Sequence, residues 1–378
     1  MYTMLLTMKI KLVPTEDQKT FLLESMEQFN VACNFISETA WRNKVYDKTT
    51  LQKLLYRDVR NQFGLSAQMT IRAIGKVSDS YRRNRAVNHT FQPHGAMIHD
   101  QRTVTYKDSD HVSILTLAGR ILVQFKTYRP IDHDHVRGQT DLIYHNNTFY
   151  LMVVTDVPEN DAVVPEGVLG VDLGIVNLAT TNDGIQYSGT KCTELRKKYS
   201  LSKARLQKAM TWDAKKHLKK ISGRERRFKR DTNHCIAKTL VQTAQDTTRM
   251  IALEDLTGIR SRVTVVNKAV RESLGKWAFF ELSSFIQYKA KLAGVMVSFV
   301  DPAYTSQQCS ACGYIDKGNR KTQAEFVCLK CNHTENADVN AAKNIAFRAA
   351  VNQPIALRSS DQIGERWKGK PTTSVVGS

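Results

Sequence analysis

Residues 168–174 read Val168-Leu169-Gly170-Val171-Asp172-Leu173-Gly174, an apolar stretch that is interrupted by one carboxylate. Short apolar runs rich in valine and leucine are typical of strands buried inside a sheet. A carboxylate among apolar neighbours is costly to bury unless a hydrogen-bonding partner or a cation compensates its charge. The stretch therefore predicts a core strand that carries a functional acid, Asp172.

Two further acids occur in similar settings. Glu254 follows the apolar run 250–253, and Asp338 lies at the start of a short helix expected over 337–350. A helix cap or a buried ion pair would explain any one of these acids alone. Three carboxylates gathered at strand ends and a helix are what a pair of Mg²⁺ ions needs for phosphodiester cleavage. We therefore predict that Asp172, Glu254 and Asp338 are the catalytic, Mg²⁺-binding residues.

Four of the seven cysteines form two tight pairs, Cys309 with Cys312 and Cys328 with Cys331. Two such pairs on separate turns can complete a tetrahedral zinc site, and four protein ligands leave no open position for catalysis. The alternative is four free cysteines placed by chance. Because the total is odd and the other three are scattered, a metal site in a reducing compartment is favoured over disulfides. We predict one structural Zn²⁺ and a cytoplasmic protein.

The 378 residues contain 55 Lys and Arg against 36 Asp and Glu, a formal net charge of +19. Such a surplus favours a polyanionic partner, usually nucleic acid. The segment 196–230 has 15 basic residues against two acids. A solvated helical face is the alternative, but solvated helices usually mix charges of both signs. The predicted nucleic-acid contacts are Lys219, Lys220, Arg224, Arg226, Arg227 and Arg230.

This basic segment is expected to form two helices that meet near Ser222 and Gly223. A weak apolar seam, which includes Leu206 and Met210, would join them. Phe228 is expected in the core and not in base stacking.

In the first half of the chain, the pattern of apolar residues changes near residue 90 from one typical of helices to one typical of strands. Between 16 and 85 apolar residues recur at helical spacing, and Ser66 is a suitable N-cap for the last helix. Beyond residue 90, short β-branched and aromatic segments alternate with turn signals such as Asn146-Asn147. The pattern predicts a small antiparallel β-domain, a barrel, into which the helical stretch is inserted or to which it leads. No apolar run approaches the roughly 20 residues that a membrane span needs, so no membrane partner is expected.

These motifs, in this order, resemble the TnpB family of transposon-associated RNA-guided nucleases, which are related to compact type V CRISPR effectors. The resemblance is specific from residue 168 to 348, and residues 65–68 extend it less distinctively. The runs that carry it are Gly170–Ile175, Arg226-Arg227-Phe228, Leu253–Leu256, Tyr304–Gly313 and Asn336–Ile345.

The resemblance implies a multidomain α+β protein. The implied parts are a β-barrel wedge domain (1–15 and 86–165), a helical recognition insertion (16–85), an RNase H-like RuvC domain (166–303), a zinc ribbon (304–335), the last RuvC helix (336–350) and a disordered tail (351–378). Asp172, Glu254 and Asp338 would bind two Mg²⁺ ions in the RuvC domain, and the four cysteines would bind Zn²⁺ in the ribbon.

The implied function is an RNA-guided DNA endonuclease of a transposable element that cleaves next to a short adjacent motif. Its partners would be a guide RNA from the transposon end and double-stranded target DNA, because base pairing reads most of the target in such systems. A monomer and a dimer are both compatible with the sequence. Two alternatives remain: an RNA-guided DNA-binding repressor that does not cleave, and a transposase that joins DNA strands.

Overall fold

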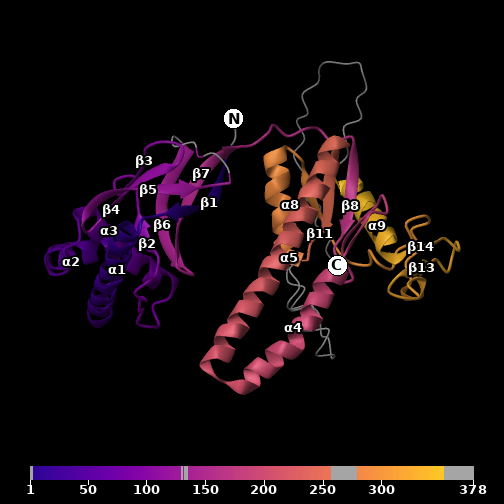
Figure 1. The fold of residues 1–378 in the computed structure, drawn as a ribbon. Helices are drawn as coiled ribbons and strands as arrows, with labels where there is room; N and C mark the ends of the chain where they lie inside the picture. The colour runs from indigo at the N-terminus through magenta and orange to yellow at the C-terminus, as the bar shows by residue number, and fades with distance from the viewer. Residues whose placement is uncertain (1–2, 129–130, 132–134, 257–278, 353–378) are drawn as a thin grey trace, which may run out of the picture. The chain divides into compact units, whose positions relative to one another are not determined.

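The computed structural model describes residues 3–128, 131, 135–256 and 279–352. The chain divides into two compact units, Met1–Pro158 and Glu159–Ser378, and each has a hydrophobic core of its own (Figure 1). Most of the predicted tail, residues 353–378, lies outside the described residues.

The first unit is built on one antiparallel sheet with the strand order β2-β6-β7-β1-β5-β4-β3. Its strands are β1 (Thr3–Val13), β2 (Met97–His99), β3 (Val104–Tyr106), β4 (His111–Thr116), β5 (Gly119–Lys126), β6 (Val136–His145) and β7 (Thr148–Pro158). The two edge strands, β2 and β3, are joined by the short turn 100–103, so the sheet curls into a nearly closed barrel. Asn146 and Asn147 both have positive φ, 49° and 60°, which confirms the predicted hairpin turn between β6 and β7.

Three helices lie between the first two strands: α1 (Glu16–Asn43), α2 (Lys48–Phe63) and α3 (Ala67–Arg83). The predicted cap of α3 is confirmed, because the Ser66 hydroxyl accepts a hydrogen bond from the Met69 N–H. At the start of α1, Thr15 and Gln18 form a reciprocal capping box.

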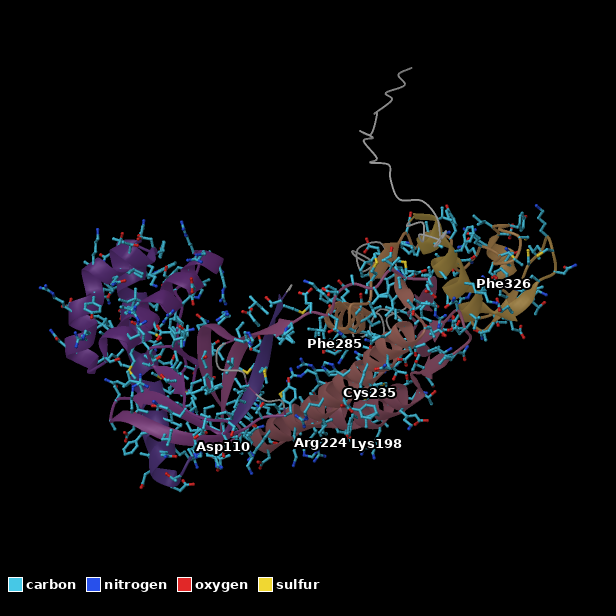
Figure 2. The ribbon with its side chains drawn as sticks, turned by 90° about the horizontal axis from the view of Figure 1, so that it is seen from above. Asp110, Lys198, Arg224, Cys235, Phe285 and Phe326 are labelled. Atoms are coloured by element: carbon cyan, nitrogen blue, oxygen red, sulfur yellow. The ribbon has the colours of Figure 1, made fainter. Side chains whose placement is uncertain are left out.

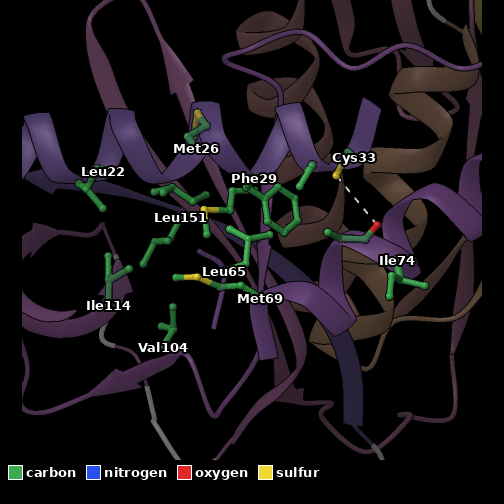
Figure 3. Packing of buried hydrophobic residues seen from close by; sticks show 14 of the residues in the cluster. Leu22, Met26, Phe29, Cys33, Leu65, Met69, Ile74, Val104, Ile114 and Leu151 are labelled. Atoms are coloured by element: carbon green, nitrogen blue, oxygen red, sulfur yellow. Dashed lines mark hydrogen bonds between the residues drawn. The ribbon is translucent and has the colours of Figure 1, made fainter. Parts of the chain in front are cut away.

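The helices and the sheet of the first unit share one core (Figure 3). Met26 and Phe29 of α1 and Met69 of α3 are buried together with Ile114 of β4 and Leu151 of β7. The sheet contributes every second residue to this core, as an amphipathic strand should.

The second unit contains a five-stranded mixed sheet with the order β10-β9-β8-β11-β12. Its strands are β8 (Gly167–Asp172), β9 (Asn177–Thr181), β10 (Gln186–Ser188), β11 (Arg249–Glu254) and β12 (Val297–Val300). The three strands β8, β11 and β12 are parallel, and β9 and β10 are antiparallel additions at one edge. The buried pattern over 168–182 is therefore a hairpin of two strands. Gly174 permits its tight reversal, since a Cβ there would lie 2.6 Å from the Asn177 carbonyl oxygen.

Helices cover both faces of this sheet (Figure 1). The described helices of the second unit are α4 (Thr190–Ala209), α5 (Trp212–Asp246), α8 (Phe279–Ala293) and α9 (Ala337–Asn352). Residues of α5 and α8 pack with Leu169 and Val171 on one face, whereas α9 packs with Ala252 and Val300 on the other.

The predicted junction between the two basic helices was wrong. The chain turns at Met210 and Thr211, and Ser222 and Gly223 lie inside α5. Met210 ends α4 in the left-handed conformation (φ 51°), and the Thr211 hydroxyl caps α5 by accepting from the Ala214 N–H. One glycine inside a long helix costs only about 1 kcal/mol, and the packing of α5 outweighs that cost.

A small ribbon separates β12 from α9. It comprises η2 (Lys317–Asn319), β13 (Glu325–Val327) and β14 (Thr334–Asn336), and it buries Phe326 in its own core (Figure 2). Within the described residues, no helix combines the length and the apolar character needed to cross a membrane.

Candidate metal centres and nucleic-acid surface

The first two predicted acids meet at one edge of the second sheet. Asp172 is the last residue of β8, and Glu254 is the last residue of the adjacent parallel strand β11. The register pairs Val171 with Leu253, so the next residues along the two strands lie side by side. Since side chains alternate along a strand and Leu253 packs with α5 and α8, both carboxylates face the side covered by α9.

The third acid reaches this place because α9 packs unusually close to β8. A Cβ on Gly170 would lie 2.2 Å from the Ala342 carbonyl oxygen and 2.8 Å from the Ala346 Cβ, so only glycine allows this approach. Asp338 lies one turn of helix before Ala342 and is 8% exposed. The glycine two residues before Asp172 therefore helps to bring Asp338 to the same face.

The electrostatics of this cluster favour a cation. Burial, and then the charges of Glu254 and Asp338, raise the pKa of Asp172 to about 8, and Arg320 counteracts this rise. Burial also raises the pKa of Glu254, although the hydrogen bond that the Thr305 hydroxyl donates to its Oε1 lowers that pKa in part. Three half-buried or buried acids that repel one another are the type of donor set that divalent oxygen-binding cations stabilise.

Three partners of the acids were not identified from the sequence. Arg320 of the ribbon contacts Asp338, with 3.3 Å between Nη2 and Oδ1, and the Asn177 amide donates to Asp338 Oδ2 at 3.0 Å. Thr305 donates to Glu254. Each partner is distant in sequence from the acid that it contacts, so no local pattern marks the pairing.

The motif around Asp338 also anchors the ribbon. Asn340 donates to the Gln308 carbonyl (2.8 Å) and accepts from the Ser310 N–H (2.9 Å). One turn later, the buried Asn344 donates to the carbonyls of Thr305 (2.9 Å) and Gln308 (2.7 Å). These asparagines fix the segment before the first cysteine pair against α9, which holds Thr305 beside Glu254.

The four ribbon cysteines converge as one group. Their sulfur atoms all lie within 4.8 Å of one another, with Cys309 and Cys328 buried. The backbone N–H groups of Lys330 and Cys331 donate hydrogen bonds to the Cys328 sulfur. Burial raises the pKa of this thiol, but these hydrogen bonds outweigh burial, and the pKa is lowered to about 6. A thiolate that already accepts backbone hydrogen bonds is suited to bind a soft cation, so the cluster fits Zn²⁺.

The six predicted nucleic-acid contacts all lie on α5, and all are solvent-exposed: Lys219, Lys220, Arg224, Arg226, Arg227 and Arg230. Lys198 of α4 and Arg224 of α5 are labelled in Figure 2 on the two arms of this helical hairpin. The expectation that Phe228 is a core residue was wrong, because its side chain is 37% exposed on the same helix. The predicted apolar seam is not buried either, since α4 has no buried residue and Met210 is 77% exposed.

Comparison with known proteins gives a family match for the ribbon and its flanking helices. Residues 279–345 match the family model described as Cas12f1-like, TNB domain. This part of the chain is similar to a Cas12f1-like TNB domain. The TNB match spans α8, β12, the cysteine ribbon and the start of α9, and therefore contains Asp338, Thr305 and Arg320.

Relatives of the chain confirm the predicted resemblance. The chain is 43% identical to a Cas12f1 endodeoxyribonuclease of Sulfoacidibacillus thermotolerans over 121 residues, 32% of this chain and 27% of the relative. It is 35% identical to a TnpB-like protein of Methanocaldococcus jannaschii over 158 residues, 41% and 56% of the two chains. It is 28% identical to the putative RNA-guided DNA endonuclease InsQ of Escherichia coli over 249 residues, 60% of each chain. Each match spans less than two thirds of the relative's length.

The fold is shared with a solved Cas12f1 protein from a complex with single-guide RNA and target DNA. The TM-score is 0.61 at 16% identity, and the match covers 86% of this chain and 82% of the other. At this identity the likeness shows the fold alone, a mixed architecture of helices and sheets.

Proposed function

We propose that this protein is an RNA-guided, Mg²⁺-dependent DNA endonuclease whose second unit is a RuvC-type nuclease domain. The observation that carries the proposal is the convergence of Asp172, Glu254 and Asp338 on the α9 face of one sheet edge. Relatives named as RNA-guided and CRISPR-associated DNA endonucleases support the same activity.

The three acids would hold two Mg²⁺ ions. When bound, such ions activate a water molecule and stabilise the leaving oxygen in phosphodiester hydrolysis. The four sulfur atoms all lie within 4.8 Å of one another. The carboxylates of Asp172, Glu254 and Asp338 are not among the groups of described residues that meet this distance, so they are more widely spaced. A wider spacing suits two ions about 3.5–4 Å apart better than one.

The remaining parts follow from the same proposal. The barrel (1–15 and 86–165) and the helices over 16–85 would hold the guide RNA and read the target-adjacent motif. The cysteine ribbon would bind one structural Zn²⁺. The exposed basic residues of α5, from Lys219 to Arg230, would contact nucleic-acid phosphates, since arginine forks match phosphate oxygens.

The first experiment is to sequence the RNA that co-purifies when the protein is expressed with its native flanking DNA. A discrete RNA that maps to the end of the gene and continues into foreign sequence would establish guidance. Only random RNA, or none with a folded protein, would reject it.

Cleavage is then measured on a DNA target matched to that RNA, in Mg²⁺, with Asp172→Ala as the comparison. We expect wild-type cleavage without joined products, and a variant that binds RNA normally but does not cut. A variant that still cuts would contradict the metal assignment, joined strands would indicate a transposase, and binding without any cleavage by the wild type would indicate a repressor.

A further inference from the structure

The turn between α4 and α5 exposes two large apolar side chains. Met210 is 77% exposed and Trp212 is 72% exposed, and α4 contributes no buried residue to any core. The turn lies at the end of the helical hairpin that is remote from β8 and β11 (Figure 1). Tryptophan is usually highly buried, so an indole presented to solvent at a projecting turn requires an explanation.

The fold of the hairpin does not account for this exposure. The Thr211 hydroxyl already caps α5, and Ala214 is the buried residue that anchors the first turn of this helix. The indole ring contacts a lysine instead of a core: Lys216 Nζ lies 4.9 Å from the Trp212 ring centroid. The ring is therefore available to a partner outside the chain.

Charge around the turn identifies the type of partner. The residues between 205 and 220 include six Lys or Arg and only one acid, Asp213. Exposed basic residues there are Arg205, Lys208, Lys215, Lys216, Lys219 and Lys220. Aromatic rings between basic side chains are the usual means of binding single-stranded nucleic acid, because each base offers a ring face while the phosphates require neutralisation. A second copy of this chain would bring the same positive charge to the contact and would be repelled.

We propose that Trp212, with Met210 at the same turn, stacks on an unpaired nucleobase while the surrounding lysines and arginines bind the flanking phosphates. The base would belong either to the RNA or to a single strand of the DNA. This site deepens the proposed nucleic-acid function and rests on it. It is separate from the carboxylate cluster, and it shares only Lys219 and Lys220 with the phosphate contacts proposed further along α5.

The test distinguishes binding to the bases from binding to the phosphates. The full chain is titrated with fluorescent 15-nucleotide oligoadenylates, one of RNA and one of DNA, and with the same two backbones lacking all bases. We expect Trp212→Ala to weaken binding of a base-bearing oligomer by about 5- to 150-fold, the range for loss of one stacked base. Binding of the abasic backbones should not change. Whether the loss occurs with RNA or with DNA identifies the strand that supplies the base.

Two variants serve as controls. Trp212→Phe keeps a ring and should retain most of the affinity, whereas Leu201→Ala removes an apolar side chain that is 71% exposed on α4 away from the turn and should have no effect. The proposal is overturned if Trp212→Ala leaves all affinities unchanged or weakens base-bearing and abasic oligomers equally. It is also overturned if the variant changes only the mass of the protein in light scattering, because the occupant is then a second copy.

The outcome is distinguishable from failure of the proposed nuclease function. A base-dependent effect of Trp212 in a protein that never cuts a guided target would support the stacking site and reject the nuclease function. Guided cleavage without that effect would support the nuclease function and reject the stacking site.

Discussion

Arg320 brings a positive charge from the ribbon to the three acids. Its guanidinium contacts Asp338 and opposes the rise in the pKa of Asp172. A cation bound by the same acids would weaken these attractions and leave the guanidinium free to contact a substrate phosphate. We therefore expect Arg320 to turn from Asp338 to a substrate phosphate once a metal ion is bound.

We expect Arg320→Ala to slow DNA cleavage at saturating Mg²⁺ by about 100-fold, as loss of one charged group near a developing charge typically does. The Mg²⁺ concentration for half-maximal rate should fall or stay unchanged, because a competing positive charge has been removed. Arg320→Lys should recover part of the rate. An unchanged saturated rate with a raised Mg²⁺ requirement would show instead that Arg320 organises the metal-binding acids.

At the scale of elements, the close contact between α9 and β8 depends on Gly170. In Gly170→Ala the new methyl group would collide with the Ala342 carbonyl, which cannot move without the helix. We expect a loss of about 1–3 kcal/mol in the free energy of unfolding, measured in denaturant, and a larger loss of cleavage than of RNA binding. Full cleavage by this variant would show that the packing does not set the position of Asp338.

Gly223 provides a matched control for this substitution. It lies inside α5, and the nearest atom to an added Cβ is the flexible Arg227 Nη1 at 3.3 Å. Gly223→Ala should therefore stabilise the protein by up to about 1 kcal/mol, because alanine favours a helix interior.

We expect the order of the ribbon to depend on its four cysteines. Its interior contains little besides Phe326, Ala337 and two of the sulfur atoms, so a bound metal would supply much of its stability. We expect a strong chelator, or Cys328→Ser, to release the metal and reduce cleavage severely while the sheet of the second unit stays folded. Zinc content by atomic emission and circular dichroism measure the two effects.

Restoration of cleavage to the chelated protein by Zn²⁺, but not by Mg²⁺ alone, is the control. Full cleavage by a protein without zinc would contradict the view that the ribbon holds Thr305 and Arg320 at the acids.

At the scale of the whole molecule, the two units have cores that share no residue. In the first unit His99 is fully buried, with Nδ1 3.2 Å from the Thr103 hydroxyl, and burial lowers its pKa to about 4. As the pH falls, the His99 side chain of the unfolded chain binds a proton near pH 6.5, whereas that of the folded chain binds one only near pH 4. The stability of the first unit should therefore be complete above pH 6.5 and decrease as the pH falls towards 4.

We expect two unfolding transitions in calorimetry of the full chain. Acidification from pH 7 to 4.5 should lower the midpoint temperature of only one of them, that of the first unit. The free energy of unfolding of the first unit should fall by on the order of 2–3 kcal/mol, and His99→Gln should remove most of this fall. His217→Gln, at an exposed histidine, is the control. A single transition, or an equal acid sensitivity of both, would contradict this account.

The features that depend on neighbouring residues could be predicted from the sequence. Ser66 caps α3 and Asn146-Asn147 turns a hairpin because caps and turns are formed by side chains within a few positions of one another. The apolar run around Asp172 and the spacing of the cysteine pairs likewise marked a buried strand and a group of four converging cysteines, because apolar runs and cysteine spacing are local. For the same reason the motifs were sufficient to indicate the TnpB resemblance.

The contacts between distant segments could be identified only in the folded chain. Thr305 donates to Glu254 and Arg320 reaches Asp338 because α9 and the ribbon fold back over the sheet. The turn at Met210 replaced the expected break at Gly223, since packing along α5 outweighs the weak helix propensity of one glycine. Such contacts depend on which surfaces bury the most apolar area together, and this property belongs to the folded chain as a whole.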